Sequence, residues 1–101
     1  MAKKGTPPAQ ANNLASNGVY VLMEEITMES CRNCLTWIMN HNLAENRLPQ
    51  LTLIINSPGG DVHAAFALID TMKASSIPIK TVGLGLIASC GFLIFIVGKK
   101  G

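Results

Sequence analysis

Two short stretches of this 101-residue chain combine residue types that suit hydrolytic chemistry. Residues 57–60, Ser-Pro-Gly-Gly, follow an apolar run, and their glycines carry no Cβ to shield the backbone N–H groups. Residues 88–91, Ala-Ser-Cys-Gly, place Ser89 where a strand gives way to a helix, a turn that exposes the serine Oγ beside the next N–H, as in a nucleophile elbow. The first stretch is therefore a place for an anion, and the second has the form of a turn that exposes a nucleophilic hydroxyl.

Each stretch also has a purely structural interpretation. Pro58-Gly59-Gly60 is typical of a tight turn that needs positive φ, and Ser89 suits the N-cap of a helix. The elbow pattern G-x-S-x-G is incomplete, since Ile87 replaces its first glycine. Two neighbouring strands that each end in a small-residue turn before a helix are nevertheless more specific together than either turn alone.

Apolar periodicity predicts three strand–helix units that position these turns. The expected strands cover residues 19–23, 51–55 and 79–83, and the expected helices about 28–43, 61–75 and 89–97. The first strand has a continuous apolar run, so we expect it to be covered on both faces. Strand–helix alternation implies an α/β fold with a parallel sheet and right-handed crossovers, and such sheets bind ligands at the carboxyl ends of their strands.

The helix boundaries and buried faces follow from the same patterns. Thr27 and Asp61 are expected at the N-termini of the first two helices. The expected buried positions are Cys31, Cys34, Leu35, Ile38 and Met39 in the first helix, and Val62, Ala65, Phe66, Ile69 and Met72 in the second. We expect the third helix to be buried, and His41 to lie at the exposed end of the first.

Composition narrows the class of protein. Charged residues make up only 14% of the chain and the net charge is +2, with no basic stripe alternating with aromatics, which predicts self-association and gives no support for nucleic-acid binding. Residues 1–18 lack apolar periodicity and a signal-peptide core, so we expect a flexible arm. Three cysteines then indicate a reducing, cytoplasmic setting, and Cys31 and Cys34 lack the second ligand pair of a zinc site.

Three stretches of the sequence carry a family resemblance. "LTLIINSPGG", then "ALIDTMK", then "GLIASCGFLIFIVGKKG" resembles the proteolytic subunit of the Clp protease, a serine peptidase of the Clp/crotonase-like superfamily. The resemblance covers residues 19–101, and the number of residues between Gly59 and Ser89 is similar to that in the family. It implies that residues 19–101 are the N-terminal portion of a Clp-protease-like α/β domain whose C-terminal part is missing.

Site roles follow from the resemblance, position by position. Ser89 matches the nucleophile, and Gly60 and Cys90 match the residues whose backbone N–H groups form the oxyanion hole. Ser57, Pro58 and Gly59 match residues that help to hold an extended peptide. The family's histidine and aspartate lie downstream of the serine, so we expect the chain alone to lack a general base. The resemblance also implies unfolded-protein or peptide substrates, homo-oligomeric rings fed by an AAA+ Clp ATPase, and no metal or organic cofactor.

Departures from the family pattern leave alternatives open. Leu86 and Ile87 make the turn before the serine unusually apolar, and His63 stands where the family commonly has a small residue. The motif "NSPGGDV" is also shared by signal-peptide-peptidase-like and phage head-maturation proteases, which recruit lysine as base. A noncatalytic subunit of a mixed ring is another alternative. Residues 82–98 contain no charged side chain, and their number is at the lower limit for a helix that spans a membrane. A small membrane protein is therefore the alternative from a different class.

Overall fold

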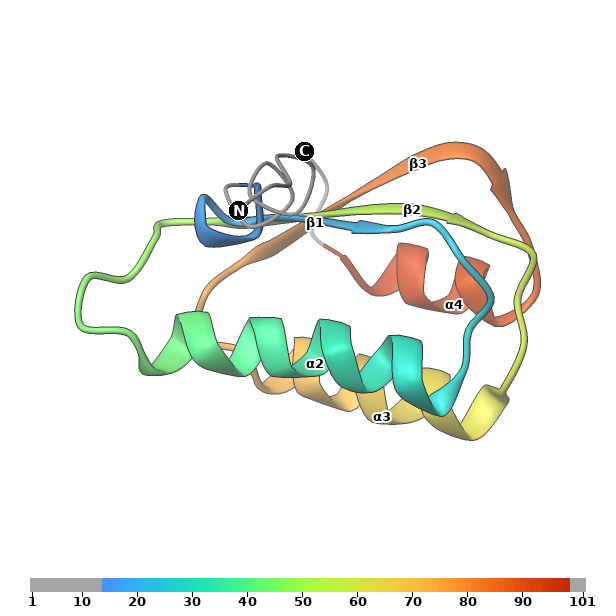
Figure 1. Ribbon diagram of the computed structural model, residues 1–101, viewed down its shortest axis with the longest axis horizontal. Helices are drawn as coiled ribbons and strands as arrows, with labels where there is room; N and C mark the ends of the chain where they lie inside the picture. Colours follow the sequence, from blue (N-terminus) through green and yellow to red (C-terminus); the bar gives the residue numbers. More distant parts are fainter. Residues whose placement is uncertain (1–13, 99–101) are drawn as a thin grey trace, which may run out of the picture.

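The computed structural model describes residues 14–98, which form a three-stranded parallel sheet with helices α2, α3 and α4 on one face (Figure 1). The strand order is β1-β2-β3, so β2 is central. The elements are β1 (Val19–Leu22), α2 (Met28–Leu43), β2 (Leu51–Ser57), α3 (Val62–Ala74), β3 (Ile79–Ile87) and α4 (Cys90–Val97). The predicted α/β class, parallel sheet and order of elements are confirmed.

The central strand β2 shows why one face of the sheet carries the core. Its residues alternate between buried and partly exposed, with Leu51, Leu53, Ile55 and Ser57 all fully buried. Side chains of a strand alternate between faces, so these four point toward the helices. No described helix covers the opposite face (Figure 1). The expectation that the first strand is covered on both faces is therefore wrong, and Val21 is 39% exposed.

The predicted N-termini of α2 and α3 are confirmed, with side-chain caps at both. Thr27 and Ser30 form a reciprocal capping box, in which each backbone N–H donates to the other's hydroxyl at 2.9 Å. Asp61 accepts from the backbone N–H groups of His63 and Ala64 at 2.9 and 3.2 Å. The caps satisfy donors that have no partner inside a helix, and the second fixes where α3 begins after the glycines.

The predicted buried stripes are partly wrong. In α2, Met39 is exposed and Trp37 is buried in its place. In α3, Val62 and Phe66 are exposed, whereas the buried positions are Ala64, Ala65, Leu68, Ile69 and Met72. The alanines present a smooth surface that lets α2 and α3 lie side by side (Figure 1). The predicted and the observed buried faces of a helix have the same period, so periodicity alone does not decide which face is buried.

Residues 82–98 do not form one continuous helix. They are divided between β3 and α4, and within residues 14–98 no helix is long and apolar enough to cross a membrane. The alternative of a membrane span over 82–98 is therefore wrong. The last helix is also less buried than expected, because only Cys90, Gly91 and Ile94 are buried, while Phe92, Leu93 and Ile96 are exposed.

Residues 14–18, at the end of the expected arm, make a helical turn that is held against α2. The Ala15 carbonyl accepts hydrogen bonds from Trp37 Nε1 at 2.9 Å and from His41 Nε2 at 2.8 Å. His41 is thus half-buried rather than at an exposed helix end. The rest of the arm, residues 1–13, lies outside the described residues.

Candidate active site

The carboxyl ends of β2 and β3 bring the two stretches of small residues together. The strands pair in regular register from Leu51 with Ile79 to Ile55 with Gly83, and pairing then resumes at Ser57 with Ile87. Asn56 alone therefore lies opposite the three residues Leu84–Leu86, where Gly85 has φ +69°. This register shift bends β3 just before its end, as extra residues in one strand do. It brings Ala88 beside Ser57 and Ser89 beside Gly59.

Ser57 contacts each of the segments that meet at this edge. Its Oγ accepts a hydrogen bond from the Gly59 N–H at 3.1 Å, and its carbonyl accepts one from the Ala88 N–H at 3.1 Å. A Cβ placed on Gly91 would lie 3.3 Å from Ser57 Cβ, so the first turn of α4 packs directly on this serine. Ser57 is 0% exposed. The turn after β2, the turn after β3 and the start of α4 therefore share one buried residue.

Ser89 has the backbone of a strained strand-to-helix turn. Its φ is +54°, and it is the one non-glycine residue with positive φ in the part of the chain that the structure describes. With ψ at −127°, this sparsely populated conformation costs an L-residue about 1–3 kcal/mol. Although Ser89 stands at the N-cap position of α4, its side chain makes no capping hydrogen bond, and the residue is exposed. Ser89 is therefore the N-cap of α4 by position, as the structural interpretation expects, but its hydroxyl does not cap the helix.

The two glycines lie directly against this serine and the β1–α2 connection. A Cβ on Gly59 would lie 2.7 Å from Ser89 Cβ and 3.2 Å from Ser89 Oγ. Gly59 and Gly60 have φ of +105° and +148°, which L side chains rarely adopt. A parallel bridge fixes the pair, since Ile26 N–H donates to the Gly59 carbonyl at 2.9 Å and Asp61 N–H donates to the Ile26 carbonyl at 2.7 Å. Glycine is therefore required at both positions.

Two backbone donors at this edge have no acceptor within residues 14–98. They are the N–H groups of Gly60, between the two bonds of the Ile26 bridge, and of Cys90, the first residue of α4. The first N–H groups of a helix have no intrahelical partner, and they carry the positive end of its dipole. Both donors belong to segments that contact Ser57 or Ser89. The edge is chemically suited to an acceptor oxygen or an anion.

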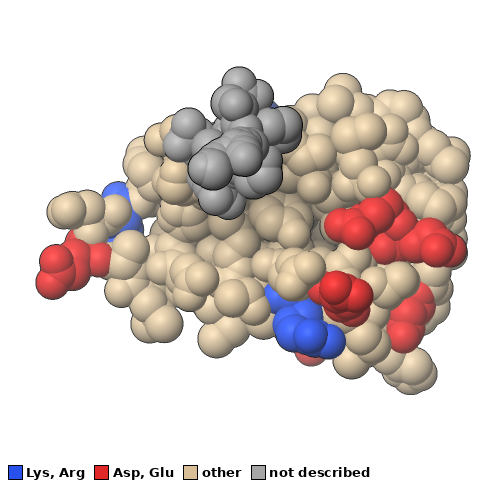
Figure 2. Space-filling view, in the orientation of Figure 1, with Lys and Arg blue, Asp and Glu red and all other residues tan. Residues whose placement is uncertain are grey.

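Acidic side chains gather at this end of the molecule (Figure 2). Glu24 and Glu25 lie in the connection between β1 and α2, and Glu29 lies in the first turn of α2. The three cysteines are buried and form no disulfide with one another, and burial raises the pKa of both Cys31 and Cys34. Those two thiols are therefore neutral at physiological pH. Within residues 14–98 no three His, Cys, Asp or Glu side chains gather as metal ligands.

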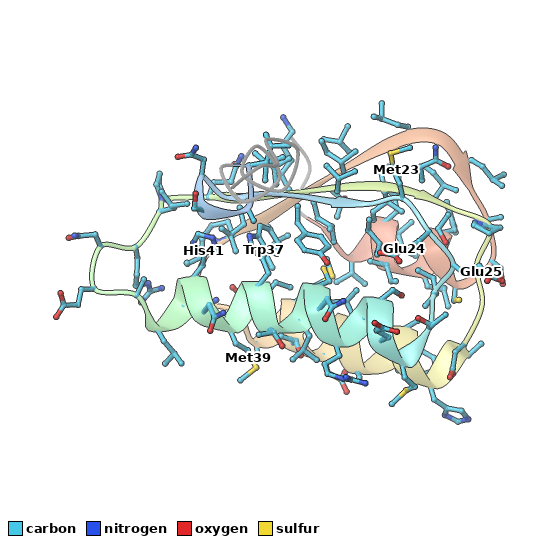
Figure 3. The ribbon with its side chains drawn as sticks, viewed as in Figure 1. Met23, Glu24, Glu25, Trp37, Met39 and His41 are labelled. Carbon is cyan, nitrogen blue, oxygen red and sulfur yellow. The ribbon has the colours of Figure 1, made fainter. Side chains whose placement is uncertain are left out.

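Neither histidine hydrogen-bonds Ser89 among the described residues. His41 lies near Trp37 in the C-terminal half of α2, whereas Glu24 and Glu25 lie at its other end, beside the site (Figure 3). His63 is exposed on the first turn of α3. The described residues thus present a serine and backbone donors without a paired base.

The structure brings together most of the residues predicted from the sequence. Ser89 lies against Gly59, and Gly60 and Cys90 flank the same edge. Of the three residues expected to hold a peptide, Ser57 and Gly59 are buried and Pro58 is exposed. Sequence reasoning missed Ile26, which clamps the glycines from an adjacent connection; no spacing links it to them. It also missed that Ser57 is bonded to both turns. A serine two residues before a turn glycine can accept that glycine's N–H, so the Ser-Pro-Gly-Gly sequence did carry a signal for the bond to Gly59.

Comparison with known proteins agrees with this geometry. The family model described as Clp protease matches residues 8–101, so the chain belongs to the Clp protease family. The ATP-dependent Clp protease proteolytic subunit 1 of Leifsonia xyli subsp. xyli is 34% identical over 101 residues, which are 100% of this chain and 51% of that protein. The proteolytic subunit 2 of Nocardia farcinica is 47% identical over 58 residues, 57% of this chain and 29% of that protein.

A solved structure extends the comparison to three dimensions. The ClpP protease catalytic domain from Plasmodium falciparum matches with a TM-score of 0.87 and 25% identity, over 100% of this chain and 56% of that one. The chain spans about half the length of the Leifsonia subunit, which it matches over all of its own residues. The family match favours the Clp interpretation over the signal-peptide-peptidase-like and phage head-maturation alternatives.

Proposed function

We propose that this chain carries the nucleophile and the oxyanion donors of a serine endopeptidase of the Clp proteolytic-subunit type. The observation that carries the proposal is the conformation of Ser89: positive φ, an exposed position, no capping hydrogen bond, and direct contact with Gly59. A serine that only ended a strand and capped a helix would have no reason to hold this strained backbone. Strain of this kind is typical of functional positions.

The chemistry assigns one step to each group. Ser89 Oγ attacks the carbonyl carbon of a peptide bond while a general base accepts its proton, and the N–H groups of Gly60 and Cys90 donate to the developing oxyanion. The C–N bond then breaks, the leaving amine takes the proton from the base, and an acyl-enzyme remains on Ser89 until water hydrolyses it. Pro58 and the backbone of Gly59 hold the extended peptide. No step requires a metal or an organic cofactor.

The family resemblance extends the proposal beyond the site. It implies a histidine base and an aspartate later in chain order than Ser89, homo-oligomeric rings, an AAA+ Clp ATPase that delivers unfolded protein, and a cytoplasmic location. The structure offers a physical reason for association, because large apolar side chains such as Phe66, Leu86 and Phe92 are half-exposed. Apolar surface of this extent is typical of contact with another chain.

A chimera tests the proposed nucleophile directly. Residues 1–101 are joined to the downstream part of a related Clp proteolytic subunit, which supplies the histidine and aspartate, and the assembled product is treated with a fluorophosphonate probe. We expect labelling that disappears in Ser89→Ala. Cys90→Ala is the matched control on the neighbouring residue, and its labelling should persist because Cys90 acts through its backbone N–H. An assembled chimera that remains unlabelled at Ser89, or that is labelled at Cys90, contradicts the proposal.

A further inference from the structure

We propose that Ser57 is a positioning residue that preorganises both oxyanion donors, rather than a residue that touches substrate. This inference rests on the proposed function of Ser89 and deepens it. The observation behind it is that one fully buried side chain holds the turn of one donor through its Oγ, while the carbonyl of the same residue holds the turn of the other. Ser57 has no exposed surface, so its side chain is placed to act on the site through the two turns that it holds.

The Oγ of Ser57 acts on the glycine turn. By accepting the Gly59 N–H at 3.1 Å it closes a local turn two residues long, a hydrogen bond that serine and aspartate make readily. This bond and the bridge to Ile26 hold Gly59 from its two ends, N–H and carbonyl. The next peptide group carries the Gly60 N–H. Its direction is therefore determined by how firmly Gly59 is held.

The carbonyl of Ser57 acts on the nucleophile turn. After the register shift opposite Asn56, the bond from Ala88 N–H to the Ser57 carbonyl is the backbone link that returns β3 to β2. Ala88 is followed by the strained Ser89 and then by the donor residue Cys90. The close approach of Gly91 to Ser57 fixes the same turn from its other side. A shift of Ser57 would thus move both donors relative to each other.

The inference separates two roles that a buried serine can have. Ser30 is a matched control, since it is 2% exposed and its hydroxyl also makes local hydrogen bonds, but it lies in the capping box of α2. If Ser57 only stabilises the fold, Ser57→Ala and Ser30→Ala should lower stability and leave the site of the folded fraction unchanged. If Ser57 positions the donors, only Ser57→Ala should alter the site.

A peptidyl boronic acid with leucine next to boron probes the donors in the 101-residue chain without requiring a base. The Ser89 O–H bond breaks, an O–B bond forms, the proton passes to water, and boron becomes a four-coordinate anion whose oxygen takes the place of the oxyanion. Affinity is measured at pH 8 by titration, and coordination by boron NMR. Loss of one oxyanion donor costs about 10²–10³-fold in rate. Since displacing a donor is milder than removing it, we expect Ser57→Ala to bind about tenfold more weakly than the unaltered chain, and Ser30→Ala to bind equally well.

Amide hydrogen exchange gives a second measurement that needs no variant. In the unaltered chain the Gly59 N–H should be protected, while the N–H of Gly60, an exposed residue, should exchange much faster, because it has no acceptor among the described residues. An unprotected Gly59 amide would overturn the inference even if Ser57→Ala does not fold.

The outcomes distinguish this inference from the proposed function. Equal boronate affinity in Ser57→Ala and the unaltered chain overturns the role of Ser57. So does an unaltered chain that binds no boronate, because the donors are then not preorganised. In both cases Ser89 labelling in the chimera still decides the proposed function independently. Tenfold weaker binding in Ser57→Ala alone, with a protected Gly59 amide, supports the positioning role.

Discussion

Replacing Gly59 by alanine tests whether the two turns are as close as the structure places them. The new Cβ would lie 2.7 Å from Ser89 Cβ and 3.2 Å from the Ala88 carbonyl oxygen, in a residue whose φ is +105°. The backbone conformation costs a non-glycine residue about 1–3 kcal/mol. Overlap in a tightly packed position costs about a further 1–3 kcal/mol. The free energy of unfolding should therefore fall by about 2–6 kcal/mol, a large fraction of the stability of a small domain.

Gly85→Ala is the matched control for the backbone term. Its φ of +69° is also positive, but its added Cβ would meet the side chain of Asn56 at 3.1 Å, which can move, rather than Ser89. The assay is urea unfolding of the 101-residue chain followed by fluorescence of Trp37, the single tryptophan, which lies on α2 away from both glycines. Equal losses of stability in the two variants would refute the close contact between Gly59 and Ser89 on which the site depends.

The other predictions concern ionisation and activity. Burial holds the pKa of Cys34 above its ordinary value of 9.0, so above pH 9 the thiol loses its proton in the unfolded chain before it does in the folded one. The free energy of unfolding should therefore fall as pH rises, by at most about 1.4 kcal/mol per pH unit. Cys34→Ala should reduce that slope in urea unfolding series between pH 8 and 10.5, and an unchanged slope would show that the thiol does not contribute. Separately, the 101-residue chain should cleave a fluorogenic peptide no faster than its Ser89→Ala variant, because no described histidine bonds Ser89. Serine-dependent cleavage by the chain alone would refute this and point to His63 as the base.

The features of the fold that depend on local signals were predictable from the sequence. Thr27 and Asp61 marked helix starts because their side chains bond nearby N–H groups, and the caps are observed. Gly59 and Gly60 were singled out because a turn with positive φ favours glycine, and the structure has positive φ at both. Ser89 was singled out by its place between a strand and a helix, and the likeness to a known family added the proposed roles of the donors.

Features that depend on packing between distant segments were not predictable. Phe66 and Met39 fit an apolar stripe as well as the side chains actually buried, because the choice of face is made by the neighbouring helix. The expected end of the third strand at residue 83 was too early, since β3 continues to Ile87 through the register shift opposite Asn56. The two exposed leucines on either side of Gly85 gave no signal of such a shift.

The same register shift has a consequence for solubility. In the described sheet β3 is an edge strand, and a long flat apolar edge is a template on which another chain can add a strand and begin to aggregate. Over Leu84–Leu86 the shift interrupts the regular ladder and the positive φ of Gly85 twists the edge away, which leaves a shorter regular run from Ile79 to Gly83. Lys80 adds a charged side chain to that run, and lysines on edge strands commonly discourage pairing with another chain. The bend just before Ser89 therefore also shortens the regular strand edge with which another copy of the chain could pair.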